Sequence, residues 1–230
     1  MPIRRTFVDW KTPLLPQVAD YLIERYTVGD RLDMRRVVAV LTGRRASRRL
    51  LELLLEKAGE RRPDFIPPRM VTFDHFPEML YPQQRRLADD LTQLLVWKKA
   101  LSSIPAREIA AALPQIPDDR AVPSWLSLCE SLRRQHNELA EEGMEFDHVF
   151  ETLSRMGNLQ EAARWKALRR IQSEYLIQMD ALPLWDREAA RLVAADQDEC
   201  RTDHDVILVG TVDMSRVVQK MILQAASASS

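Results

Sequence analysis

A cluster of four arginines behind a glycine is the part of this chain best suited to bind phosphate. The glycine is Gly43, and the arginines are Arg44, Arg45, Arg48 and Arg49. A helix that begins here would point unpaired N–H groups and the positive end of its dipole at an anion. Arginine forks also match the oxygens of a phosphate group. The sequence therefore predicts a phosphate- or DNA-binding site that also includes Ser47, with a solvated basic helix face as the other interpretation.

The same segment lacks the residues with which a P-loop hydrolyses nucleotide. A P-loop ends in Gly-Lys-Ser/Thr, so that backbone N–H groups, an ammonium group and a hydroxyl group reach the phosphates and Mg²⁺. Counted from Gly43, those three places hold Arg48, Arg49 and Leu50. Arg48 has a Cβ where the backbone should approach a phosphate, and Leu50 cannot ligate Mg²⁺. We therefore expect no hydrolysis through this loop.

The basic charge of the chain is concentrated around this segment. The whole chain has a net charge of −1, yet residues 1–50 hold eleven Lys and Arg against five Asp and Glu. This distribution favours a surface that faces phosphates. The near-neutral total argues against strong non-specific binding of nucleic acid by these 230 residues alone.

The elements that must position the arginines form an α/β pattern. Short, apolar, Val-rich runs have the composition of strands buried on both faces of a parallel sheet, and they lie at 36–41, 69–73 and 205–210. Helical periodicity is found at 10–26, directly after Gly43, and at 215–225. Asp74 is placed to cap the turn after the second strand. This order of elements predicts a doubly wound α/β sheet.

Long helical patterns without a strand candidate fill the middle of the chain. The three longest lie at 86–101, 124–142 and 159–178. The simplest architecture is an α/β core made of residues 1–80 and 200–230, with a helical subdomain inserted at 81–199. Tryptophans in the helical patterns are expected to pack in the core. Residues 226–230 have the composition of a disordered tail.

Composition excludes several classes of protein. The chain is 46% hydrophobic and 29% charged, and no apolar run approaches the ~20 residues of a membrane span. Its first residues lack the apolar core of a signal peptide, so we expect a cytoplasmic location and no membrane partner. Cys129 and Cys200 lack metal-site spacing, and the four histidines are scattered. We therefore expect two reduced structural thiols, no metal and no cofactor.

Several segments resemble one protein family in the order in which that family has them. They lie at 40–50 (VLTGRRASRRL), 68–76, 165–168, 186–192 and 206–215 (VILVGTVDMS). These segments resemble the N-terminal region of the AddB family, whose members are subunits of AddAB helicase-nucleases. The first is similar to the family's inactive P-loop. The last is similar to the family's "hhhhGFxDhT" segment, an apolar strand and the residues that follow it, with Thr211 where an aromatic residue is common.

The resemblance implies a P-loop NTPase-like parallel sheet of the superfamily 1 helicase type, with a large all-helical insertion. An active helicase has Asp-Glu directly after the strand that corresponds to the one predicted at 205–210. This chain has Gly210 and Thr211 at those two positions. Asp213 follows, and we expect these three positions to be a degenerate acidic motif. In the family, the nuclease is a C-terminal domain, so the parent protein would be an exonuclease while these 230 residues are not catalytic.

Three functions remain open at this point. The first is a non-catalytic DNA-handling module of a double-strand-break repair helicase-nuclease, which contacts single-stranded DNA or a duplex end beside an AddA-like helicase subunit. The second is a scaffold that docks a helicase partner and touches no DNA. The third is an active nucleotide-dependent enzyme that uses Arg49 in place of lysine. Leu50 and Gly210 both count against the third.

Overall fold

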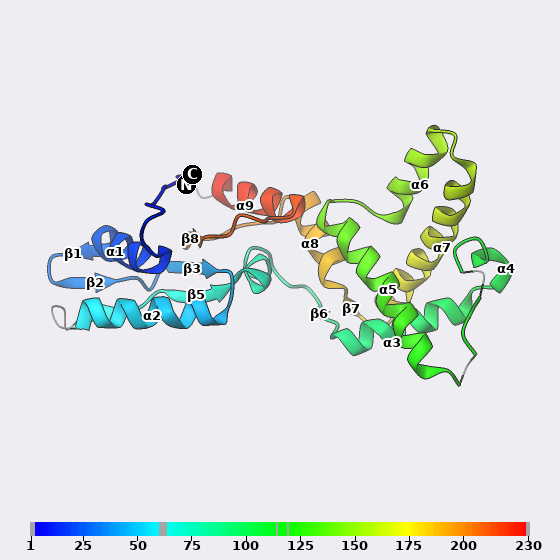
Figure 1. The fold of residues 1–230 in the computed structure, drawn as a ribbon, viewed down its shortest axis with the longest axis horizontal. Coiled ribbons are helices and arrows are strands. Elements are labelled where there is room, and N and C mark those ends of the chain that lie inside the picture. The colour runs from blue at the N-terminus through cyan, green and yellow to red at the C-terminus, as the bar shows by residue number, and fades with distance from the viewer. Residues whose placement is uncertain (1–2, 60–63, 114, 119, 229–230) are drawn as a thin grey trace. The chain divides into compact units, whose positions relative to one another are not determined.

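The computed structural model describes residues 3–59, 64–113, 115–118 and 120–228, and these residues form an α/β protein (Figure 1). The chain divides into two compact units. One comprises Met1–Pro82, Asp198–Met214 and Gln219–Ser230, and the other comprises Gln83–Gln197 and Ser215–Val218. We call them the α/β unit and the helical unit. None of the helices in the described ranges is long and apolar enough to cross a membrane.

A three-stranded parallel sheet is the centre of the α/β unit. Strand β3 (Val37–Leu41) lies between β5 (Arg69–Thr72) and β8 (Asp205–Val209), and it pairs in parallel with both. All three predicted strands are therefore confirmed. Leu41 lies level with Thr72 on one side and with Val209 on the other. Because the strands are parallel, the residues that follow each of them meet at one edge of the sheet, which we call the carboxyl edge.

Strand β3 is buried on both faces, which is why its sequence is a continuous apolar run. On one face, Val37, Ala39 and Leu41 belong to a core shared with helices α1 (Leu14–Tyr26) and α2 (Arg44–Gly59). The helices contribute Val18, Ala19, Leu22, Leu50, Leu53, Leu54 and Ala58 to this core. Val38 and Val40 alternate with these strand residues and are buried on the opposite face.

Several short elements of the α/β unit were not predicted. Strands β1 (Thr27–Val28), β2 (Arg31–Asp33) and β4 (Asp64–Ile66) form a second small sheet. Strands of two or three residues are too short to establish a period in the sequence. The turn between β1 and β2 uses Gly29, whose φ of 59° is a conformation that favours glycine.

Several boundaries in the α/β unit differ from the sequence-based expectation. Residues after β5 form two short 3₁₀ helices, η1 (Phe73–His75) and η2 (Pro77–Met79), and η1 follows Thr72 without a side-chain cap. The predicted capping role of Asp74 is therefore wrong, because Asp74 lies inside η1. Helix α9 (Arg216–Ala228) continues through the first three residues of the expected tail, and residues 229–230 lie outside the described ranges.

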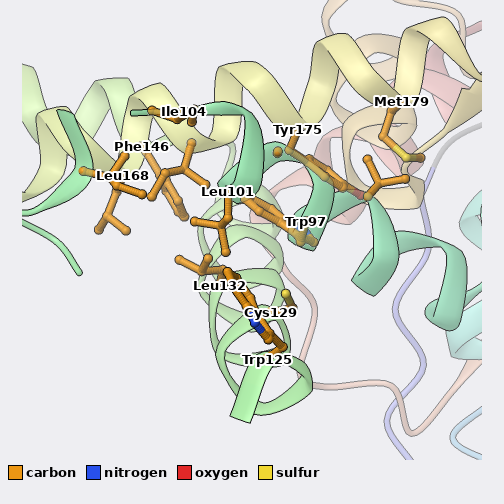
Figure 2. Packing of buried hydrophobic residues seen from close by; sticks show 14 of the residues in the cluster. Trp97, Leu101, Ile104, Trp125, Cys129, Leu132, Phe146, Leu168, Tyr175 and Met179 are labelled. Atoms are coloured by element: carbon orange, nitrogen blue, oxygen red, sulfur yellow. The ribbon is translucent and has the colours of Figure 1, made fainter. Parts of the chain in front are cut away.

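The helical unit contains most of the helices. They are α3 (Asp90–Ser103), α4 (Ala106–Ile109), α5 (Val122–Glu141), α6 (Phe146–Arg155), α7 (Leu159–Ala181) and α8 (Arg187–Asp196). Helix α7 contacts α3, α4 and α6, while α5 contacts α3 and α8. The core between them is apolar and aromatic, and Figure 2 shows Trp97 lying against Tyr175 at its centre. Trp97 and Trp125 are buried there, which confirms the packing predicted for them.

A short parallel strand pair corrects the expectation that no strand interrupts the helical region. Strands β6 (Arg86–Leu87) and β7 (Leu184–Trp185) pair with each other. The helix expected from residue 86 therefore begins only at Asp90. Asp89 caps this helix, because its side chain accepts a hydrogen bond from the Thr92 N–H at 2.7 Å.

Candidate functional site

The arginine cluster occupies the first turns of α2, directly after the central strand. Gly43 precedes the helix, and its carbonyl oxygen accepts hydrogen bonds from the Ser47 N–H at 3.1 Å and the Ser47 hydroxyl at 3.2 Å. The Ser47 hydroxyl proton is thus used within the helix. A Cβ built on Gly43 would have no atom within 4 Å, so the approach to this end of α2 is open.

The four arginines divide into one paired and three unpaired side chains. Arg49 pairs with Glu52 at 3.1 Å and with Glu56 at 3.2 Å. The other three, Arg44, Arg45 and Arg48, are exposed, and no ion pair or hydrogen bond joins their side chains to any other residue that the structure describes. The four arginines and Glu52 line a shallow hollow on the surface of α2. Three positive charges are therefore free to meet an anion.

Leu50 occupies the place of the Mg²⁺-binding hydroxyl of a P-loop, and it lies in the core of the α/β unit. Its side chain is fully buried among residues of α1, β3 and α2. Arg49, in the place of the lysine, is held by two glutamates of its own helix. Neither residue is arranged for phosphoryl transfer, which requires a cation and a metal ligand at the terminal phosphate.

The second predicted segment meets the arginine turn at the carboxyl edge. Gly210 follows Val209 of β8 and is level with Thr42, which follows Leu41 of β3. Thr211 is half-buried and Asp213 is exposed. The structure thus brings two segments that are far apart in the sequence to one edge of the sheet. Gly210 has a φ of 63°, and a Cβ placed there would lie 3.1 Å from Leu14 Cδ2.

We expect Gly210→Ala to destabilise the α/β unit by roughly 1–2 kcal/mol, because alanine is strained at positive φ and its Cβ would crowd Leu14. The matched control is Gly59→Ala at the end of α2. Gly59 has open space around a Cβ and no positive φ, so this change should be neutral or slightly stabilising. Denaturant unfolding of both variants checks the sign, and equal stabilities would contradict the strain at Gly210.

The described residues show neither a cluster of metal ligands nor a reactive thiol. No group of three or more His, Cys, Asp or Glu among them is placed to hold a metal ion. Cys129 and Cys200 are buried cysteines outside any disulfide between described residues. Burial raises the pKa of each thiol to about 11, so both stay protonated and are poor nucleophiles at neutral pH.

A buried polar network in the helical unit was not foreseen from the sequence. It joins His136 of α5, Gln172 and Tyr175 of α7, and Asp186, which caps α8. Asp186 accepts hydrogen bonds from the Tyr175 hydroxyl at 2.8 Å and from the backbone N–H groups of Glu188 and Ala189. All four side chains are at most 3% exposed. The four positions are spread over fifty residues, so no local spacing could have revealed them.

The hydrogen bonds of Gln172 determine the tautomer of His136. The Phe146 N–H donates to Gln172 Oε1 at 3.2 Å, so the Gln172 amide nitrogen must face His136 Nδ1, 2.8 Å away. Nδ1 therefore accepts, so Nε2 carries a ring proton and lies 3.5 Å from Asp186 Oδ1. Because the network is closed to solvent, it positions α5, α7 and α8 rather than binding a substrate.

Comparisons of the sequence with models of known protein families and with curated proteins find no match in either set.

Proposed function

We propose that this chain is a non-catalytic DNA-handling module that contacts phosphates through the first turns of α2. The observation that carries the proposal is the set of three exposed, unpaired arginines, Arg44, Arg45 and Arg48, at the carboxyl edge of a parallel sheet. Helix N-termini at this edge of a parallel sheet are common phosphate sites, because N–H groups and the helix dipole point there. Arginine adds charge and fork geometry to that arrangement.

The proposed fold is the inactivated P-loop core of an AddB-like protein, of the superfamily 1 helicase type, with a helical insertion at 81–199. In support, the arginine turn follows the central strand of the order β5-β3-β8, and the segment after β8 ends at the same edge. In a P-loop NTPase those two places hold the phosphate-binding loop and the acidic motif.

This module would bind DNA without hydrolysing nucleotide, and it would need no cofactor. Arg49 is engaged by Glu52 and Glu56, and Leu50 is buried in the core. Gly210 and Thr211 stand where an active helicase has its two acidic residues. An active enzyme would therefore lack the metal ligand, the base and a free cation in the lysine position, which disfavours this alternative.

The resemblance places the proposed module in a double-strand-break repair helicase-nuclease of the cytoplasm. Its partners would be single-stranded DNA or a duplex end and an AddA-like helicase subunit, and the nuclease would be a separate C-terminal domain. The alternative is a scaffold that docks the helicase subunit without touching DNA. The two proposals differ in one measurable property, because only the first requires the three arginines to contact DNA.

The triple variant Arg44→Ala/Arg45→Ala/Arg48→Ala should weaken DNA binding at least tenfold, since charge-assisted hydrogen bonds to phosphate are lost. Fluorescence anisotropy of labelled oligonucleotides at low salt measures the change. The matched control is Arg49→Ala on the same helix, which removes an arginine already paired with Glu52 and Glu56 and should change the affinity much less. Equal affinities of the triple variant and the wild type would favour the scaffold.

A further inference from the structure

Trp10 is the most exposed large hydrophobic side chain in the part of the chain that the structure describes. Its relative exposure is 100%, and Phe7 just before it is 92% exposed. Tryptophan side chains are usually largely buried, because they carry a large apolar area. A wholly exposed indole ring is therefore a candidate contact for a ligand.

The backbone around Trp10 is held in place although its ring is free. Gln17, in the first turns of α1, accepts a hydrogen bond from the Asp9 N–H at 3.0 Å. The Gln17 amide also donates to the carbonyl oxygens of Asp9 at 2.9 Å and Thr12 at 3.0 Å. These bonds tie the residues on both sides of Trp10 to the helix. A ring presented on a fixed backbone loses little conformational entropy on binding.

Trp10 is located near the carboxyl edge of the sheet. Helix α1 begins at Leu14, and Leu14 Cδ2 lies 3.1 Å from the Cβ position of Gly210 at that edge. Because Gln17 ties residues 9–12 to the first turns of α1, Trp10 belongs to the same end of the α/β unit. Helix α2 also begins at this end, directly after β3. The exposed ring and the three unpaired arginines are therefore presented at one end of the unit.

The charged residues near Trp10 in the sequence favour a polyanion as its ligand over an apolar protein surface. Arg4, Arg5 and Lys11 have exposed side chains, and no ion pair joins them to another described residue. The carboxylate of Asp9, the residue before Trp10, accepts a hydrogen bond from the Lys11 N–H at 3.1 Å. An exposed aromatic ring combined with cationic side chains is an arrangement with which proteins bind single-stranded nucleic acid, whose bases are free to stack.

We propose that Trp10 is a stacking platform for a base of single-stranded DNA, with the phosphates of that strand contacting Arg44, Arg45 and Arg48. This inference rests on the proposed function and adds that the bound strand is single. In duplex DNA the base faces are already stacked on one another, so an indole ring gains nothing from them without unstacking the helix. The platform should therefore discriminate between the two forms of DNA.

Trp10→Ala should weaken binding of a single-stranded oligothymidylate about tenfold and should change duplex affinity less than about twofold. Trp10→Phe keeps an aromatic face and should retain most of the affinity. The matched control is Val28→Ala, which removes another exposed apolar side chain, 80% exposed, from the α/β unit. Binding should also quench part of the tryptophan fluorescence of the wild type, and this part should be absent in Trp10→Phe.

An unchanged single-strand affinity of Trp10→Ala overturns the platform and leaves the exposed ring to a protein partner. An equal loss on single-stranded and duplex DNA also overturns it, because stacking would then not be the cause. The arginine triple variant separates this failure from failure of the proposed function. If it loses affinity while Trp10→Ala does not, only the platform is wrong, and if it binds as the wild type does, the proposed function is wrong.

Discussion

Trp97→Ala is expected to destabilise the helical unit by about 3–5 kcal/mol, the range for removing a fully buried tryptophan. Trp97 is completely buried, and its ring stacks on Tyr175 with centroids 4.0 Å apart and planes 5° apart. It also makes an edge-type contact with the His136 ring, whose centroid lies 5.8 Å from that of Trp97. None of the described residues accepts a hydrogen bond from the indole N–H of Trp97, so the expected loss comes from packing.

The matched control for this prediction is Trp10→Ala, the same chemical change at a wholly exposed position. It should change the free energy of unfolding by less than about 0.5 kcal/mol. Denaturant unfolding followed by far-ultraviolet circular dichroism measures both variants. A loss below about 1 kcal/mol for Trp97→Ala would contradict the central position of this side chain in the helical unit.

Asp186→Asn is expected to destabilise the helical unit by about 2 kcal/mol at neutral pH. Asparagine can still cap α8, so the change isolates the charge of the carboxylate. Burial by itself would raise the pKa of the Asp186 carboxyl. Its contacts with His136, with the Ala189 N–H and with the Tyr175 hydroxyl outweigh burial and lower the pKa to about 2.

The pH dependence follows from that lowered pKa. The pKa of an aspartate in the unfolded chain is about 3.9. Above that pH, the ionised carboxylate of Asp186 therefore contributes its full stabilisation to the fold. As the pH falls through about 4 and then about 2, the folded protein loses this contribution. The stability difference between wild type and Asp186→Asn should therefore shrink over this interval. A difference that stays constant down to pH 2 would contradict the role of the charge.

The main elements of the fold could be predicted because their signals are local. Strand β3 is a run of five apolar residues, and α2 has leucines at helical spacing. The pair β6 and β7 could not be predicted, since two-residue strands have no period and their partners are almost a hundred residues apart. The helical pattern at 86–101 predicts too early a start for α3, which begins at Asp90 because Asp89 caps it.

The candidate site could be predicted in part for the same physical reason. The glycine and the arginines are adjacent in the sequence, so their place at the start of a helix follows from local pattern. The ion pairs of Arg49 depend on its side-chain rotamer and on the positions of Glu52 and Glu56. The same holds for the absence of such pairs between Arg44 or Arg48 and any described residue. The exposure of Trp10 did not follow from the helical pattern at 10–26, because α1 begins only at Leu14 and leaves Trp10 outside the helix.

The salt dependence of single-stranded DNA binding tests the central claim most directly. Each phosphate contact on a single strand steepens the slope of log affinity against log salt by about 0.7, so removing Arg44, Arg45 and Arg48 should reduce the slope by up to about 2.1. Arg49→Ala, measured alongside, should leave the slope almost unchanged. A triple variant with the wild-type slope would contradict the claim that these arginines contact DNA.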